Sequence, residues 1–400
     1  MIPISRVPDG DAVDFHPIYQ VYDIRTDIRP TVAEVDLAAL RKNADLLQAQ
    51  VGPGVGLLAV VKADAYGHGA LACARALERK VFGFAVSLVE EGIELRRGGV
   101  EAPILVLGSF YGLSHRDVVA YRLTPVVGDE ADLERFARAA EEFAQSRNQP
   151  MKPLGIHLKV DTGMSRLGVT PDRLDAFLTR LRQTSAVELT GLCTHLAEAD
   201  GEDPAPTEAQ LRQFAAARKQ LLDAGFRPTL THVANSAGTA RFAEARFDLV
   251  RPGLALYSPN GFTAGLQPVL ALKSRIVALR EVPAGTRVSY SGLYRTAEPA
   301  RIATVPIGYA DGYSRRLSGQ AQVLVGGQRR PVLGAITMDM CMVSVDDETR
   351  LGDEVVLLGA QGQARISVGE LARWGGTIEW EVFTSISKRV PRIYVGERHG

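Results

Sequence analysis

Long apolar runs, paired cysteines and an excess of one charge are all missing from this 400-residue sequence. Its three cysteines, Cys73, Cys193 and Cys341, lie far apart, and none shows a Cys-x-x-Cys or Cys/His ligand spacing. This pattern disfavours a disulfide framework and a zinc site. We therefore expect no metal site and a reducing compartment.

Positive charge is not in surplus, because 46 lysines and arginines are balanced by 46 aspartates and glutamates. General nucleic-acid binding needs surplus positive charge to displace counterions, so we expect no nucleic-acid partner. No stretch reaches membrane-spanning length, and residues 1–15 have neither a basic head nor an apolar run of signal-peptide length. These absences predict a cytoplasmic globular protein without a membrane partner.

Between residues 30 and 268 the sequence alternates short apolar runs with helix-like segments. The runs are nearly continuous in apolar character, which is typical of parallel strands covered on both faces. This alternation predicts a (β/α)8 barrel of the α/β class. A doubly wound sheet is the alternative, but no Gly-x-Gly-x-x-Gly follows the first run. The eight runs are 57–61, 81–86, 103–107, 123–127, 154–160, 187–195, 229–235 and 247–253.

From residue 269 to residue 400 the pattern changes. Strand-like segments meet turn signals without long helices between them, as in 301–308 and 321–345. This predicts a mainly antiparallel β domain, interrupted by one short helix near 367–376. Residues 1–29 are polar and irregular, and we interpret them as an N-terminal extension.

Polar residues gather at the carboxyl ends of the predicted barrel strands. In this fold those ends form one face, where the active site lies and phosphate groups often bind after strands 7 and 8. Taken alone, each residue also fits a solvated strand end, a turn, or a local ion pair such as Arg251 with Asp248. Their convergence on one face favours a functional site. They are Lys62, Lys159, Asp161, Arg166, His195, Asn235, Ser236 and Arg251, the last followed by Pro252 and Gly253.

The most unusual of these residues is Lys62, in the segment AVVKADAYGHGA at 59–70. A lysine amine has a pKa of about 10.4 in water, and partial desolvation turns it into a nucleophile toward a carbonyl. Pyridoxal phosphate is such a carbonyl compound, and Ser236 and the backbone around Gly253 suit its phosphate. An arginine at its ring nitrogen would leave that nitrogen unprotonated, because arginine stays charged.

Eight ordered motifs make the sequence resemble the alanine racemase family over nearly the whole chain from about residue 30. AVVKADAYGHG is similar to the segment that carries the cofactor lysine of that family. The resemblance implies pyridoxal 5'-phosphate as cofactor and the interconversion of L-alanine and D-alanine. The other motifs are KVDTGMSRLG (159–168), THLAEAD (194–200), HVANSAG (232–238), RPGLALY (251–257), VSYSGLY (288–294), PIGYADGY (306–313) and TMDMCM (337–342).

The resemblance also implies how the cofactor is bound. Lys62 would bond its aldehyde, and Arg251 would face its ring nitrogen with His232 in support. His195 would lie beside the cofactor. The phosphate would be held by Tyr66, Ser236, Gly253 and Leu254.

The implied reaction is a 1,1-proton transfer by two bases, Lys62 and Tyr290. Two bases are needed because a single base tends to return the proton to the face that it left. Tyr290 would come from the other subunit of a head-to-tail homodimer with shared active sites. Arg166 would steady this tyrosine and the substrate carboxylate. Met338 matches a family residue whose backbone contacts the substrate carboxylate, and Tyr309 matches one that lines the access corridor. Lys159 matches a lysine that is carbamylated in some members.

Trp380 occupies the last cofactor-binding position, where the family usually has a tyrosine. It implies either neutral variation or a reshaped pocket with a weaker phosphate grip or an altered substrate range. The alternative function is therefore a racemase of broader or serine preference on the same scaffold. A decarboxylase and a non-catalytic cofactor-binding barrel fit less well, because neither accounts for Tyr290. The D-alanine would supply peptidoglycan synthesis, or the enzyme would serve alanine breakdown.

Overall fold

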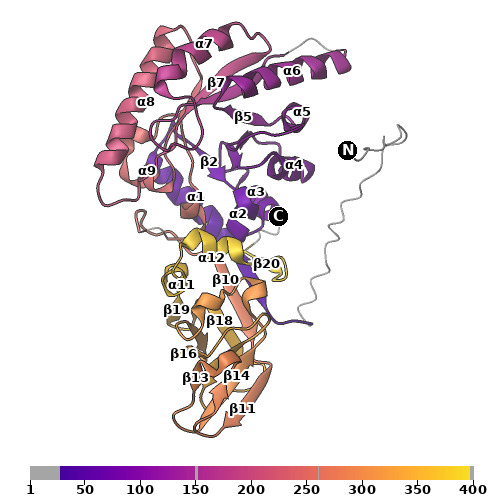
Figure 1. Ribbon diagram of the computed structural model, residues 1–400, viewed down its shortest axis with the longest axis vertical. Helices are drawn as coiled ribbons and strands as arrows, with labels where there is room; N and C mark the ends of the chain where they lie inside the picture. The colour runs from indigo at the N-terminus through magenta and orange to yellow at the C-terminus, as the bar shows by residue number, and fades with distance from the viewer. Residues whose placement is uncertain (1–27, 149–151, 260, 397–400) are drawn as a thin grey trace, which may run out of the picture.

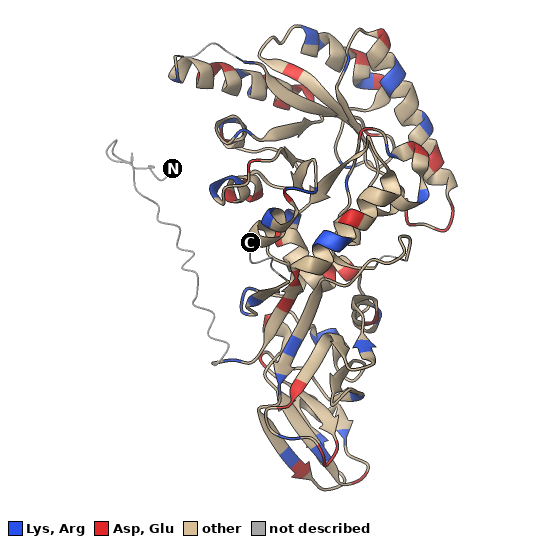
Figure 2. Ribbon diagram, turned by 180° about the vertical axis from the view of Figure 1, so that it is seen from behind, with Lys and Arg blue, Asp and Glu red and all other residues tan. Residues whose placement is uncertain are grey.

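The computed structural model describes residues 28–148, 152–259 and 261–396 and has two parts stacked along its long axis (Figure 1). One part is a closed barrel and the other is a β domain. Two short helices, α11 (Val368–Gly375) and α12 (Glu379–Ser385), lie where the two parts meet. Basic and acidic residues are interspersed over both parts (Figure 2).

The barrel consists of eight parallel strands, and its last strand closes on its first. Its strands are almost entirely buried, which explains why they are nearly continuous apolar runs in the sequence. The predicted (β/α)8 architecture is therefore confirmed. The strands are β2 (Gly56–Val60), β3 (Gly83–Val86), β4 (Ile104–Val106), β5 (Thr124–Val127), β6 (Leu154–Lys159), β7 (Val187–Cys193), β8 (Leu230–His232) and β9 (Leu249–Val250).

A helix or helical turn follows each barrel strand. Two of the longer helices, 37–51 and 130–146, begin at aspartates that accept backbone hydrogen bonds, as Asp129 does from the N–H of Asp132 at 2.8 Å. The helices are α1 (Leu37–Val51), α2 (Lys62–Gly67), α3 (Ala70–Leu77), α4 (Val89–Arg97), α5 (Ser114–Ala120), α6 (Glu130–Ser146), α7 (Leu174–Arg182), α8 (Ala205–Asp223), α9 (Ser236–Arg241) and α10 (Leu254–Tyr257), with 3₁₀ turns η1 (Pro171–Arg173) and η2 (Ala243–Ala245).

The second part is mainly an antiparallel sheet, as predicted. The predicted short helix near 367–376 corresponds to α11. Three 3₁₀ turns, η3 (Tyr290–Gly292), η4 (Tyr309–Asp311) and η5 (Arg315–Leu317), lie between its strands. The strands are β10 (Leu270–Arg275), β11 (Ala278–Val282), β12 (Arg287–Val288), β13 (Tyr294–Arg295), β14 (Ala300–Val305), β15 (Gln322–Val325), β16 (Gln328–Leu333), β17 (Cys341–Val345), β18 (Glu354–Gln361) and β19 (Ala364–Ile366).

One strand from the start of the chain also belongs to this sheet. β1 (Val32–Asp36) pairs antiparallel with β10 and parallel with β20 (Arg392–Val395). These residues fall within the range 30–268 that was predicted to form the barrel. The prediction missed their place because the sequence of a five-residue strand directly before α1 does not show with which strand it pairs. The first and last strands of the described chain thus lie side by side.

None of the helices in the described part of the chain combines the length and the apolar character needed to cross a membrane.

Candidate active site

Lys62 follows β2 and opens α2, a turn with an unusual backbone. The next four residues, Ala63 to Tyr66, have φ between 51° and 54°, in the left-handed region. This conformation costs L-residues about 1–2 kcal/mol each, so the surrounding structure must hold the turn in place. Burial, and then the charge of Arg166, lower the pKa of Lys62 below its ordinary value. A lowered pKa increases the fraction of neutral, nucleophilic amine.

Side chains outside the turn satisfy its backbone groups. Glu91 Oε1 accepts a hydrogen bond from the N–H of Ala63 at 2.6 Å. His68 Nδ1 lies 2.9 and 3.0 Å from the backbone oxygens of Ala65 and Tyr66. Burial lowers the pKa of His68 to about 4, so its neutral ring can donate from Nδ1. His68 therefore supports the turn that carries the lysine and does not line the cavity beside it.

That cavity has a volume of about 630 Å³ and lies between the barrel face and helices α11 and α12. All eight predicted cofactor-binding residues line it: Lys62, Tyr66, His195, Ser236, Arg251, Gly253, Leu254 and Trp380. Sequence reasoning gave no role to Asp200, Arg373 and Glu379, which line it as well. Asp200 ends one of the family motifs, whereas Arg373 in α11 and Glu379 in α12 had no local signal of a role in the site.

Arg251 is buried at one wall of the cavity. Its guanidinium donates hydrogen bonds to three backbone carbonyl oxygens at 2.7 to 2.9 Å and to His232 Nδ1 at 2.6 Å. The alternative pairing with Asp248 is not formed, since Asp248 Oδ2 accepts the N–H of Thr231 at 2.7 Å. Arginine keeps its proton even when buried, so these contacts fix a positive charge in the wall.

Three histidines surround this arginine and are neutral. Burial and the charge of Arg251 lower the pKa of His157 to about 4, that of His195 to about 3 and that of His232 well below its ordinary value. Because His232 Nδ1 accepts from Arg251, its Nε2 carries the proton and donates to His157 Nδ1 at 2.8 Å. The tautomer of His232 is therefore set by its neighbours. His232, predicted to support Arg251, contacts it directly through this hydrogen bond.

A second wall is built from backbone N–H groups and a small residue. Ser236 Oγ accepts from the N–H of Gly253 at 2.9 Å and from the N–H of Ala255 at 3.3 Å. A Cβ atom at Gly253 would collide with the hydroxyl of Tyr66. The glycine therefore leaves room for a group that must approach the backbone closely, as a phosphate does.

Lys159 and Arg166 lie at the end of β6 and in the loop after it. Lys159 is buried, and burial lowers its pKa. Arg166 is exposed and does not line the 630 Å³ cavity, although its charge acts on Lys62. The structure thus brings Arg166 near the lysine without closing it over the cavity.

Tyr290, Tyr309 and Met338 do not reach the cavity of their own chain. All three belong to the β domain, and their exposed fractions are 69%, 42% and 53%. Tyr290 opens η3, where Ser289 and Ser291 have φ of 63° and 59°. A single chain therefore presents these side chains to the outside.

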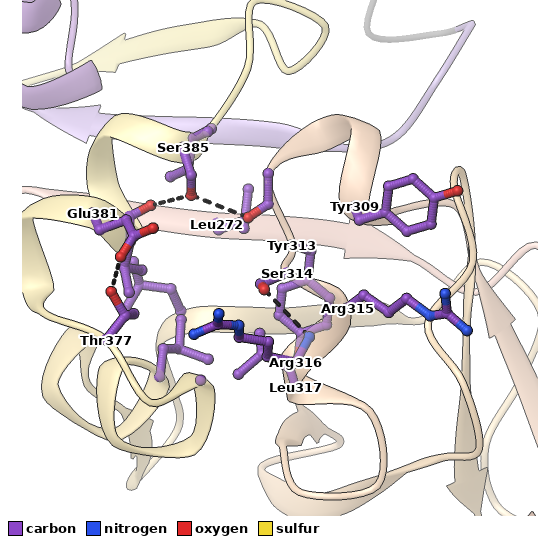
Figure 3. Close-up of a pocket in the computed structure, with 16 residues that line it drawn as sticks. Leu272, Tyr309, Tyr313, Ser314, Arg315, Arg316, Leu317, Thr377, Glu381 and Ser385 are labelled. Carbon is purple, nitrogen blue, oxygen red and sulfur yellow. Dashed lines mark hydrogen bonds between the residues drawn. The ribbon is translucent and has the colours of Figure 1, made fainter. Parts of the chain in front are cut away.

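A smaller cavity of about 350 Å³ lies on the other side of the turn between α11 and α12. Tyr309 points away from its centre (Figure 3). At its rim, Thr377 donates a hydrogen bond to Glu381 and Ser385 donates to the backbone oxygen of Gly312. No lysine or histidine is among the residues that line it. Among the described residues, the smaller cavity therefore offers no lysine amine or imidazole, whereas the predicted cofactor-binding residues line the larger one.

Two protein-family models match this chain. The model of the alanine racemase N-terminal domain matches residues 35–260, and that of the C-terminal domain matches residues 269–394. The chain belongs to the alanine racemase family. It is therefore an isomerase, and the predicted family is confirmed.

Curated alanine racemases resemble the chain over almost their full length. The protein of Sorangium cellulosum is 44% identical over 382 residues, which cover 92% of this chain and 99% of the relative. The Geobacter sulfurreducens racemase is 41% identical, with coverage of 92% and 98%. Among solved structures, the alanine racemase of D-cycloserine-producing Streptomyces lavendulae is 34% identical with a TM-score of 0.87, covering 92% and 97%. The Bacillus anthracis alanine racemase with bound L-Ala-P is 36% identical with a TM-score of 0.84, covering 92% and 95%.

Proposed function

We propose that this racemase interconverts L-alanine and D-alanine with pyridoxal 5'-phosphate in the 630 Å³ cavity. The observation that carries the proposal is the arrangement of Lys62, Arg251 and the Ser236–Gly253 wall around one space. An amine with a lowered pKa suits an aldehyde, a fixed guanidinium suits a ring nitrogen, and N–H groups beside a glycine suit a phosphate. When bound, the cofactor supplies an electron sink that acidifies the α-hydrogen of an amino acid.

Lys62 has two tasks in this proposal. It would hold the cofactor by its aldehyde, and with an amino acid in that place its Nζ would take or return a proton on one face of the substrate. Bonding the aldehyde and taking a proton both require the neutral amine, which burial and the nearby charge of Arg166 favour by lowering the pKa of Lys62. Returning a proton requires the protonated amine, which taking a proton produces.

Arg251 keeps the opposite wall positively charged throughout. Because it does not release its proton, a ring nitrogen held beside it would stay unprotonated. The buried network of His232 and His157 holds the guanidinium in one orientation. His195 is neutral, since burial and then Arg251 lower its pKa to about 3, so it can orient neighbouring groups by hydrogen bonding but cannot stabilise a phenolate by charge. That task remains for Arg166.

Tyr290 is proposed as the second base, supplied by another copy of the chain. Its exposed position on η3, together with exposed Tyr309 and Met338, fits a head-to-tail homodimer in which each β domain covers the cavity of its partner. A proton can then leave one face and return on the other. Tyrosine has a pKa of about 10 in water, so the positive charge of Arg166 is needed to favour its phenolate.

Lys159 is proposed to be a carbamylation site. It is buried, and burial lowers its pKa, so its neutral amine is available to react with carbon dioxide. The resulting carbamate is negative and would orient the guanidinium of Arg166, as the resemblance implies. We also propose a cytoplasmic enzyme that binds a small amino acid and its own copy, and whose D-alanine supplies peptidoglycan synthesis.

The direct test is an assay of the purified protein loaded with pyridoxal 5'-phosphate. We expect a visible absorbance band from the lysine-bound cofactor and formation of D-alanine from L-alanine until both enantiomers are equal. Release of carbon dioxide instead would favour a decarboxylase, and a band without turnover would favour a non-catalytic cofactor-binding protein. Either result would overturn the proposed reaction.

Trp380 is the residue most suited to alter the substrate range. It lines the cavity with 37% of its surface exposed. Because indole is larger than phenol, we expect Trp380→Tyr to change KM for alanine, or the ratio of serine to alanine turnover, by about three- to tenfold. Racemisation kinetics with L-alanine and L-serine measure this. Unchanged constants for both amino acids would show that the tryptophan is neutral variation.

A further inference from the structure

We infer that Asp311 is a positioning residue that fixes the turn carrying Met338, so that one protomer presents this turn to the active site of its partner. The inference rests on the shared-site dimer proposed above. It concerns two backbone turns, 308–311 and 337–340, which the chain itself packs together.

The two turns move as one body because their backbones are bonded directly. The N–H of Tyr309 donates to Thr337 O at 3.0 Å, and the N–H of Ala310 donates to Met338 O at 3.0 Å. A Cβ atom at Gly308 would collide with the backbone oxygens of Thr337 and Met338. Tyr309 and Met338 therefore share one rigid support.

Asp311 is the buried ionic centre of this support. Its residue is fully buried, and its Oδ2 accepts hydrogen bonds from the N–H of Gly308 at 2.9 Å and from Arg29 Nη2 at 2.5 Å. Its Oδ1 lies 3.4 Å from Arg389 Nε. A buried carboxylate is costly unless paired, so the two arginines determine where this turn can lie.

Arg389 extends the pairing to the second turn. Its Nη2 donates to Asp339 Oδ1 at 2.7 Å, and Asp339 is the neighbour of Met338. One guanidinium thus contacts the buried carboxylate of the first turn and the exposed carboxylate of the second. Shifting Asp311 would shift Met338 with it.

The segment that carries Arg389 is tied to the barrel. Arg392 donates to the backbone oxygens of Ser387 and Val390 at 2.7 and 2.8 Å, and its Nε donates to Gly67 O at 2.9 Å. Gly67 ends the turn that begins at Lys62. These contacts therefore fix the orientation of the turn 337–340 relative to the barrel of the same protomer.

The test uses Asp311→Asn in the loaded enzyme. The amide keeps the shape but leaves both arginines without a buried counter-charge, so we expect KM for L-alanine to rise about tenfold while kcat changes less than about twofold. We expect a larger effect on KM than on kcat because Met338 is proposed to contact the substrate carboxylate and takes no part in the proton transfer. Equal loss in kcat and kcat/KM, or unchanged kinetics, would overturn the inference.

Hybrid dimers of two tagged chains locate the effect. When one chain carries Lys62→Ala, only the cavity of the other chain works, and it receives its turn from the Lys62→Ala chain. Asp311→Asn in the Lys62→Ala chain should raise KM, and the same change in the other chain should not. Equal effects from both placements, or an effect only from the second, would overturn the inference.

Two further variants separate this outcome from others. Tyr290→Phe in the same two placements tests the shared site itself, so a position-independent effect of that change would defeat the dimer proposal first. If Asp311→Asn does not fold, Asp339→Asn is used instead, because it removes only the exposed ion pair between Asp339 and Arg389. It should raise KM about threefold with an unchanged melting temperature, and an unchanged KM would contradict the inference.

Discussion

Lys62→Ala is expected to remove the visible absorbance of the bound cofactor and to lower kcat by about 10⁴-fold or more. Within the described part of the chain, Lys62 is the only lysine that lines the 630 Å³ cavity. Its alanine variant therefore loses both the covalent attachment and one of the two proposed bases. Absorbance spectroscopy and D-alanine formation measure the two losses separately.

The matched control for this experiment is Lys80→Ala. Lys80 pairs with Asp45 on the surface and has no proposed role in the cavity. Its loss should therefore change neither the absorbance spectrum of the cofactor nor the rate of D-alanine formation. Addition of a primary amine should partly restore turnover in Lys62→Ala, because the missing group is an amine. A Lys62→Ala enzyme with a normal spectrum and normal rate would contradict the assignment of the lysine.

Tyr290→Phe is expected to keep the cofactor bound while reducing kcat by about 10²- to 10⁴-fold, the usual contribution of a positioned acid or base. The ring stays, so packing on η3 is preserved and only the hydroxyl is lost. We expect the loss to fall mainly on proton removal from L-alanine, whereas Lys62 still serves the D-enantiomer. Exchange of the α-hydrogen of each enantiomer with deuterated water measures this asymmetry.

Tyr294→Phe serves as control for the tyrosine. It lies in the same VSYSGLY segment and is 37% exposed, but it has no proposed role in proton transfer. Equal exchange of both enantiomers in Tyr290→Phe would contradict a two-base reaction. Full activity from an isolated single subunit would contradict the donation of Tyr290 between chains.

The sequence predicted the barrel because its strands are buried on both faces, so apolar runs such as 57–61 appear without interruption. It did not predict α12, since Glu379–Ser385 lacks a capping side chain and its pattern is too short. The gathering of Lys62, His195 and Arg251 around one cavity was predictable because strand ends meet on one face. The network around Asp311 was not, because Arg29 lies 282 residues away in sequence and is joined to it only by folding.

The pairing of β1 between β10 and β20 has a consequence for biosynthesis. During translation β1 emerges before the barrel strands, but its two partners, β10 and β20, are made only after the whole barrel. A strand with unpaired backbone groups must therefore wait through most of elongation, and such edges invite mispairing with other nascent chains. Removal of β20 would leave β1 as an edge strand, paired on one side only with β10.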